Sequence, residues 1–130
     1  MPAARGVPSS AARAMNVPGD GEAAKIDAAA SWLRLRGVAA AGFGFVLGSG
    51  LRDFAQSIDD ALALPFGDVP HWPAPAVEGH GAEIVCGSIG PAQVACLTGR
   101  AHVYEGWTAA EVARPVRTLR RLGIERFVLT

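Results

Sequence analysis

The sequence predicts an α/β fold with a mixed sheet, and three observations lead to this class. Short apolar runs bounded by glycines alternate with helical segments along the chain, which is typical of α/β proteins. Two of these runs, Ala82–Ser88 and Ala92–Thr98, are separated only by Ile89-Gly90-Pro91, so we expect an antiparallel hairpin within the sheet. The chain has 130 residues, of which 50% are hydrophobic and 18% charged, so it can bury a core as one domain or part of one.

The N-terminal segment differs in composition from the rest of the chain. Residues 1–21 are rich in Ala, Pro, Gly and Ser and contain the breaker cluster Asn16–Gly21, so we expect a disordered tail there. The folded part is expected over residues 22–130. Its first element is a helix over Glu22–Arg36, which Gly37 ends as the residue after the cap. The apolar face of this helix consists of Ile26, Ala29, Ala30 and Leu33.

The middle of the chain is expected to hold a buried strand followed by irregular structure. Phe43–Leu47 is a compact apolar run bounded by glycines, which favours a buried strand. Leu51–Ser57 can then begin a short helix. Two prolines and a glycine interrupt Leu62–Trp72, so we expect irregular structure there, and we interpret Asp59-Asp60 as a solvated turn.

The C-terminal part predicts a capped helix and a final strand. Thr108-Ala109-Ala110-Glu111 is a capping box, in which each side chain accepts from the other residue's backbone N–H. The apolar face consists of Val112, Val116, Leu119 and Leu122. Pro115 lacks an N–H, so we expect a kink or a preceding 3₁₀ turn. Gly123 ends the helix before a strand over Ile124–Leu129. That strand stops where a βαβ unit opens its next loop, so we expect an N-terminal portion of a larger protein.

The composition argues against several classes of partner. Twelve Lys+Arg balance twelve Asp+Glu, so no net charge attracts nucleic acid or anionic lipid. No apolar run is long enough to span a bilayer, and the N-terminus lacks a signal-peptide pattern, so we expect a cytoplasmic protein. Cys86 and Cys96 lack zinc-ligand spacing. We therefore expect buried free thiols and no metal site.

Two glycine-rich loops are candidates for binding an anion. Gly48-Ser49-Gly50 follows a strand and precedes a helix, where backbone N–H groups and the Ser49 hydroxyl can converge on a phosphate. The alternative is a plain strand-to-helix turn. His80 lies between Gly79 and Gly81, and it is either a ligand on a flexible loop or a structural histidine.

The stretch Leu97–Trp107 carries the most varied chemistry. A strand there runs into a loop with a cation, a titratable ring, a phenol and a carboxylate, and loops of this kind commonly hold sites. Arg100 and His102 are two residues apart, so both can face one side and bind an anion. Tyr104 can contact a sugar hydroxyl or pack on Trp107, and Glu105 can orient His102 or remain a solvated acid. The structural alternative for Arg100 is a surface salt bridge. For His102 it is a capping role or a place in the core.

The combination of these motifs resembles the trimeric purine nucleoside phosphorylase family. The resemblance rests on Gly48-Ser49-Gly50-Leu51, Gly79-His80-Gly81, Gly99-Arg100-Ala101-His102-Val103-Tyr104-Glu105-Gly106 and Arg114-Pro115-Val116-Arg117, in that order from about Phe43 to Thr130. It implies an incomplete nucleoside phosphorylase-like fold. It also implies a pentosyltransferase that splits purine nucleosides with orthophosphate, giving purine base and pentose 1-phosphate.

The same resemblance implies a role for individual residues. It assigns Ser49, His80, Arg100, Ala101 and His102 to phosphate binding, with Arg100 and His102 as the catalytic residues. It assigns Tyr104 to nucleoside binding. It assigns Glu105 to holding the ligand-contacting residues in place without touching the ligand itself. The implied partners are a purine nucleoside and phosphate, without a cofactor, in a homotrimer.

The resemblance covers only the phosphate half of the site. The family's purine-recognising Asn and Glu, a second phosphate-contacting serine and the aromatic residue that completes a neighbour's site would follow Thr130. We therefore expect the isolated chain to have little or no activity. Two alternatives stay open, a catalytically inactive truncated fragment or partner domain and a methylthioadenosine phosphorylase.

Overall fold

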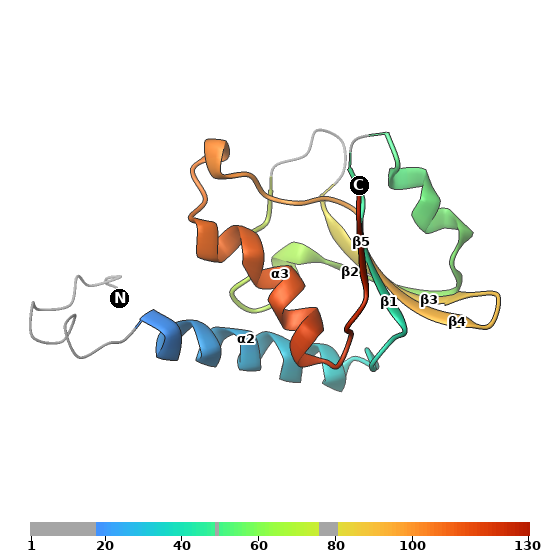
Figure 1. The fold of residues 1–130 in the computed structure, drawn as a ribbon, viewed down its shortest axis with the longest axis horizontal. Coiled ribbons are helices and arrows are strands. Elements are labelled where there is room, and N and C mark those ends of the chain that lie inside the picture. Colours follow the sequence, from blue (N-terminus) through green and yellow to red (C-terminus); the bar gives the residue numbers. More distant parts are fainter. Residues whose placement is uncertain (1–17, 49, 76–80) are drawn as a thin grey trace, which may run out of the picture.

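The computed structural model describes residues 18–48, 50–75 and 81–130 (Figure 1). In chain order the elements are α2 (Pro18–Leu35), β1 (Phe43–Val46), η1 (Arg52–Ser57), β2 (Asp59–Pro65), η2 (Phe66–Asp68), β3 (Glu83–Ile89), β4 (Ala92–Leu97), η3 (Val103–Glu105), α3 (Ala109–Arg121) and β5 (Phe127–Leu129). The η elements are 3₁₀ helices.

Within the described residues the strands form a five-stranded mixed sheet in the order β2-β3-β4-β1-β5. β1 is parallel to both of its neighbours, with Phe45 opposite Cys96 of β4 and Val128 of β5. The pairs β2·β3 and β3·β4 are antiparallel, and Gly90 turns the hairpin between β3 and β4 at a φ of 58°. The α/β class and the mixed sheet predicted from the sequence are confirmed.

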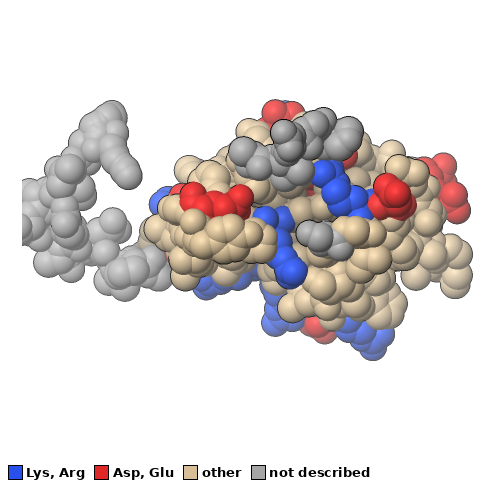
Figure 2. Space-filling view, turned by 90° about the horizontal axis from the view of Figure 1, so that it is seen from above, with Lys and Arg blue, Asp and Glu red and all other residues tan. Residues whose placement is uncertain are grey.

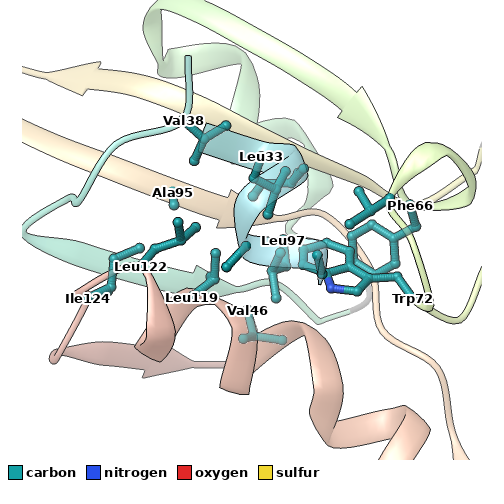
Figure 3. Close-up of a cluster of buried hydrophobic side chains, with 14 of the residues drawn as sticks. Leu33, Val38, Val46, Phe66, Trp72, Ala95, Leu97, Leu119, Leu122 and Ile124 are labelled. Atoms are coloured by element: carbon teal, nitrogen blue, oxygen red, sulfur yellow. The ribbon is translucent and has the colours of Figure 1, made fainter. Parts of the chain in front are cut away.

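Both long helices cover one face of this sheet, as Figure 1 shows. Their apolar faces pack on inward-pointing strand residues to form the main core, and Figure 3 labels ten of its members: Leu33, Val38, Val46, Phe66, Trp72, Ala95, Leu97, Leu119, Leu122 and Ile124. The predicted face of α2 (Ile26, Ala29, Ala30 and Leu33) is buried throughout. Burying a large aliphatic side chain contributes about 1.5–3 kcal/mol, so this layer supplies most of the fold's stability.

The opposite face of the sheet carries a smaller apolar cluster. Leu47, Ile58, Val85, Val94 and Cys96 are its buried members, and Ala55 of η1 packs against them. The expected short helix after β1 is thus present as a 3₁₀ helix rather than an α-helix.

Helix α2 begins earlier than the sequence predicted. It starts at Pro18, so the expected tail over residues 1–21 is wrong for its last four positions, and residues 1–17 lie outside the described part. Proline is well tolerated in a first helical turn, where its missing N–H has no partner to lose. Gly37 ends the helix at a φ of 94°, and the Val38 N–H donates to the Leu33 carbonyl at 3.0 Å, which is the predicted C-terminal pattern.

The expectation of irregular structure over Leu62–Trp72 is wrong for its first part. Asp59–Pro65 forms strand β2, so Asp59-Asp60 also lies in a strand rather than in a solvated turn, although both residues are exposed. A register shift between Asp59 and Leu62 accommodates Asp60 at a φ of 52°. Pro65 ends this edge strand, where a missing N–H costs no ladder hydrogen bond.

Helix α3 follows its capping prediction closely. The Glu111 N–H donates to the Thr108 Oγ1 at 3.1 Å, and the Thr108 N–H donates to the Glu111 Oε1 at 2.8 Å. The helix runs from Ala109 to Arg121 through Pro115 without interruption. Leu119 and Leu122 are buried and Val112 and Val116 half-buried, so the predicted apolar face is confirmed.

Both cysteines are free thiols, as predicted. Cys86 packs against the main core and Cys96 belongs to the cluster on the other face, so the two side chains point away from each other. Burial raises the pKa of Cys86 to about 12, with a smaller contribution from the nearby Cys96, and burial raises that of Cys96 to about 11. In the described part of the chain, no helix is long and apolar enough to cross a membrane.

Candidate anion site at the carboxyl ends of the strands

Three parallel strands deliver the candidate loops to one edge of the sheet. β1 ends at Val46 and leads to Gly48, β4 ends at Leu97 and leads to Arg100, and β5 ends at Leu129 beside Thr130. In open α/β sheets this edge is where ligands bind. Figure 2 looks onto it and shows Lys and Arg side chains near the middle of the face.

The turn after β1 is closed by a backbone hydrogen bond. The Leu51 N–H donates to the Gly48 carbonyl at 3.2 Å, and Gly50 adopts a φ of 85°. Left-handed backbone of this kind favours glycine. Gly48 is restricted for a different reason, because a Cβ there would lie 2.9 Å from the Thr130 carbonyl oxygen and 3.6 Å from Nη2 of Arg100.

Arg100 reaches across the sheet edge to the end of β5. Its Nη2 donates to the Thr130 carbonyl at 2.8 Å. The guanidinium therefore lies beside Gly48, and the structure brings together the first residue of the glycine turn and the predicted phosphate-binding arginine. Ser49 and His80, the other candidates for this site, lie outside the described residues.

His102, Tyr104 and Glu105 form a second group on the loop after β4. The rings of His102 and Tyr104 stack at 4.8 Å between centroids and 13° between planes. Tyr104 is 84% exposed, so it stacks on His102 and projects to solvent. Oε1 of Glu105 accepts from the backbone N–H of His102 at 2.9 Å, and Gly106 closes the turn at a φ of 102°.

These two groups share a loop but are held separately. Arg100 is tied to Thr130, whereas His102 is tied to Glu105 and Tyr104, and among the described residues no hydrogen bond or ion pair connects the groups. Glu105 fixes the His102 backbone rather than its imidazole. Ala101, between them, is buried.

The comparisons with known proteins agree on one family, although no protein-family model matches the chain. Purine nucleoside phosphorylase 1 of Geobacillus stearothermophilus is 37% identical over 105 residues, 81% of this chain and 38% of that protein. Purine nucleoside phosphorylase 1 of Bacillus subtilis (strain 168) is 34% identical over 106 residues, 82% of this chain and 39% of that protein. The chain belongs to the purine nucleoside phosphorylase family.

Structural similarity supports the same relationship. The crystal structure of the purine nucleoside phosphorylase from Schistosoma mansoni in complex with acetate matches with a TM-score of 0.75 and 27% identity, over 81% of this chain and 39% of that chain. The chain thus spans 38–39% of the length of these relatives. The described sheet corresponds to a part of the phosphorylase fold.

Two residues at this phosphorylase sheet edge were not predicted from the sequence. Nη2 of Arg52, from η1, donates to the Gly81 carbonyl at 3.1 Å, which ties the turn after β1 to the segment before β3. Oγ1 of Thr130 accepts from the Gly48 N–H at 2.8 Å and donates to the Val46 carbonyl at 3.2 Å. Only the strand order reveals these partners, because they are 29 to 84 residues apart.

An apolar pocket of about 160 Å³ opens beside Arg100, between the sheet edge and α3. Its walls include Val46 and Leu129 from the strands and Val112 and Val116 from the helix. A low-dielectric wall beside a guanidinium strengthens that group's interaction with an anion. Across the described residues, no three His, Cys, Asp or Glu side chains lie close enough to hold a metal ion.

A buried ion pair holds the two helices behind this pocket. Nε of Arg114 donates to Oε2 of Glu22 at 2.6 Å, and Nη2 donates to Oε1 at 2.7 Å. A third guanidinium N–H donates to the His71 carbonyl. Hydrogen bonding from Arg114 lowers the pKa of Glu22, against a smaller opposing effect of burial, and the same pairing raises the pKa of Arg114. Glu22 and Arg114 thereby fix α2, α3 and the loop after β2 to one another.

Proposed function

We propose that this chain forms the phosphate-binding half of a purine nucleoside phosphorylase site. In this reaction orthophosphate cleaves a purine nucleoside to the free base and a pentose 1-phosphate. The observation that carries the proposal is the proximity of Gly48 and Arg100 at the carboxyl ends of parallel strands: both lie against Thr130, and a Cβ at Gly48 would be 3.6 Å from Nη2 of Arg100. The curated relatives carry the name of this activity.

Arg100 is proposed as the main phosphate ligand. A guanidinium presents several N–H donors in a plane and can hold two oxygens of one phosphate at the same time. Nη2 donates to Thr130, and among the described residues the other guanidinium N–H groups have no protein acceptor, so they can donate to an anion. Ser49, His80, Ala101 and His102 are proposed as further phosphate contacts, on the strength of the family motif alone.

Tyr104 is proposed to meet the sugar, and Glu105 to support the loop from behind. Stacking on His102 holds the Tyr104 ring in one orientation while its hydroxyl stays accessible. The hydrogen bond from the His102 N–H to Glu105 closes the short turn that carries both rings. Glu105 therefore acts on the ligands through the backbone.

The chemistry follows from where the phosphate is held. The bond between the sugar's anomeric carbon and the base nitrogen breaks, and the base keeps the electron pair. The sugar becomes oxocarbenium-like, a phosphate oxygen stabilises that cation, and the same oxygen then bonds to the anomeric carbon. Arg100 and His102 are proposed as the catalytic residues because they hold this nucleophile in place.

Base recognition is not proposed for this chain. No residue at the described sheet edge is assigned to the purine, and the chain spans 38–39% of its relatives. We therefore propose that the chain alone has little or no phosphorolytic activity. From the family resemblance we also propose that the complete enzyme is a cytoplasmic homotrimer that acts on purine nucleosides without a cofactor. An assay with inosine and phosphate that gives hypoxanthine at a normal enzymatic rate from this chain would contradict the first point.

Isothermal titration with orthophosphate tests the proposed function. We expect Arg100→Ala to weaken phosphate binding about tenfold or more, because a charge-assisted hydrogen bond contributes about 1.5–3 kcal/mol. Arg126→Ala is the matched control, since it removes the same charge just before β5, at the other end of the sheet. Equal affinities of the parent and Arg100→Ala would overturn the proposal.

A further inference from the structure

Thr130 connects the two parts of the proposed phosphate site. Its hydroxyl accepts from the Gly48 N–H at 2.8 Å, and its carbonyl accepts from Nη2 of Arg100 at 2.8 Å. The glycine turn and the arginine come from different strands, and this residue contacts both. Gly48 and Thr130 are 82 residues apart in the chain, and Arg100 and Thr130 are 30 apart.

We propose that Thr130 is a positioning residue for phosphate binding, acting through the Gly48 turn and the Arg100 guanidinium. This inference rests on the function proposed above, in which Thr130 has no assigned role. Thr130 is not a catalytic residue, since its hydroxyl, its carbonyl and its N–H are all hydrogen-bonded to protein partners.

The hydroxyl fixes the register of the turn. It donates to the Val46 carbonyl at 3.2 Å while accepting from Gly48, so it links the last residue of β1 to the first residue of the turn. The Thr130 N–H also donates to the Val46 carbonyl, at 3.0 Å, and holds the threonine itself in place. Gly48 is therefore held both by the Thr130 hydroxyl and by the Leu51 N–H, which donates to its carbonyl.

The carbonyl fixes the arginine. Arg100 is an exposed residue, and an unrestrained arginine loses rotamer entropy when a ligand immobilises it. The hydrogen bond to Thr130 restricts the guanidinium before phosphate arrives. A Cβ at Gly48 would lie only 2.9 Å from this same carbonyl oxygen. A glycine at position 48 is therefore needed for the turn to pack against Thr130 while Thr130 binds Arg100.

The test compares Thr130→Val, which keeps the shape and removes the hydroxyl, with Thr130→Ser, which keeps the hydroxyl. The parent, Thr130→Val and Thr130→Ser differ only in this side chain, so the comparison isolates the hydroxyl. Two-dimensional ¹H–¹⁵N spectra of the full chain monitor folding, the Gly48 amide and the Arg100 side chain. Phosphate is then titrated in a phosphate-free buffer.

For Thr130→Val we expect faster hydrogen exchange at the Gly48 amide, a shifted Arg100 Nε resonance and about two- to tenfold weaker phosphate binding, the range that one lost hydrogen bond gives. Thr130→Ser is expected to match the parent in Gly48 amide exchange, in the Arg100 Nε resonance and in phosphate affinity. Unchanged Gly48 and Arg100 resonances in a folded Thr130→Val, or equal phosphate affinity, would overturn the positioning role. Failure of the parent to bind phosphate would overturn the proposed function instead, and the two resonances would still decide whether Thr130 orients these groups.

Discussion

Glu22 and Arg114 are 92 residues apart in the chain and meet in a buried two-point ion pair, with N–O distances of 2.6 and 2.7 Å. The guanidinium also donates to the His71 carbonyl, so one side chain joins α2, α3 and the loop after β2. Trp72, next to His71, donates from Nε1 to the Thr118 hydroxyl at 3.0 Å and packs edge-on against Phe66. Phe66 lines the pocket beside Arg100, so this contact supports the wall of the proposed site.

Replacing Glu22 by Gln is expected to destabilise the fold by about 3 kcal/mol, because removing one partner leaves the Arg114 charge buried without compensation. Urea unfolding followed by circular dichroism measures the free energy of unfolding. Asp27→Asn is the control, since its ion pair with Arg121 is half-exposed and such pairs contribute about 0–1 kcal/mol. A Glu22→Met/Arg114→Met double variant should recover much of the loss, and equal effects of Glu22→Gln and Asp27→Asn would contradict the role of the pair.

The stability of the parent should depend on pH through Glu22. The pKa of Glu22 is lowered from its ordinary value of 4.5 by the hydrogen bond from Arg114. A carboxyl group with a depressed pKa stabilises the fold above its unfolded-state pKa, and this contribution is lost as the pH falls through the folded-state pKa. Unfolding curves should therefore separate the parent from Glu22→Gln at pH 7 and bring them together well below pH 4.5. A gap that stays constant on acidification would exclude this assignment.

Gly48→Ala should damage both stability and phosphate binding. The added Cβ would lie 2.9 Å from the backbone oxygen of Thr130, and overpacking of this kind costs about 1–3 kcal/mol. Gly42→Ala is the matched control, because its Cβ would meet the Gln93 carbonyl at an ordinary 3.7 Å. Thermal unfolding and phosphate titration of both variants make the comparison, and a Gly48→Ala chain that behaves like Gly42→Ala would show that the turn is not held against Thr130.

Both thiols should react slowly in the folded chain. Burial raises the pKa of Cys86 to about 12 and that of Cys96 to about 11, so almost no thiolate is present at pH 8. We expect reaction with a disulfide reagent to be at least about tenfold slower in buffer than in urea. Fast labelling of either cysteine in the folded chain would indicate that the sheet faces open.

Local sequence signals predict those helices whose terminal backbone groups are hydrogen-bonded by residues close by in the chain. The Thr108–Glu111 capping box and Gly37 close hydrogen bonds within a few residues, so their effect is visible in the sequence. Pro65 predicts a break in β2, and only the place of this strand at the sheet edge makes the proline harmless. Pro18 lies in the breaker cluster that predicts a disordered tail, whereas the structure places it at the start of α2.

The candidate site divides in the same way. The composition of the loop after β4 predicts a site, because Arg100, His102, Tyr104 and Glu105 all lie among the six residues between Gly99 and Gly106. Thr130 and Arg52 gave no signal, since a threonine at a strand end and an arginine in a short helix are common. Their partners are set by the strand order, which places β5 beside β1 and the start of β3 beside the end of β4.

One anion is expected to bind between the Gly48 turn and Arg100. A crystal structure of the chain grown with arsenate, a phosphate analogue with a strong anomalous signal, would locate this anion. We expect an anomalous peak within hydrogen-bonding distance of the Arg100 guanidinium and of an amide in the turn from Gly48 to Leu51. A peak found only in the groove between α2 and α3, which Arg117, Arg120 and Arg121 line, would contradict it, as would a well-ordered sheet edge that holds no arsenate.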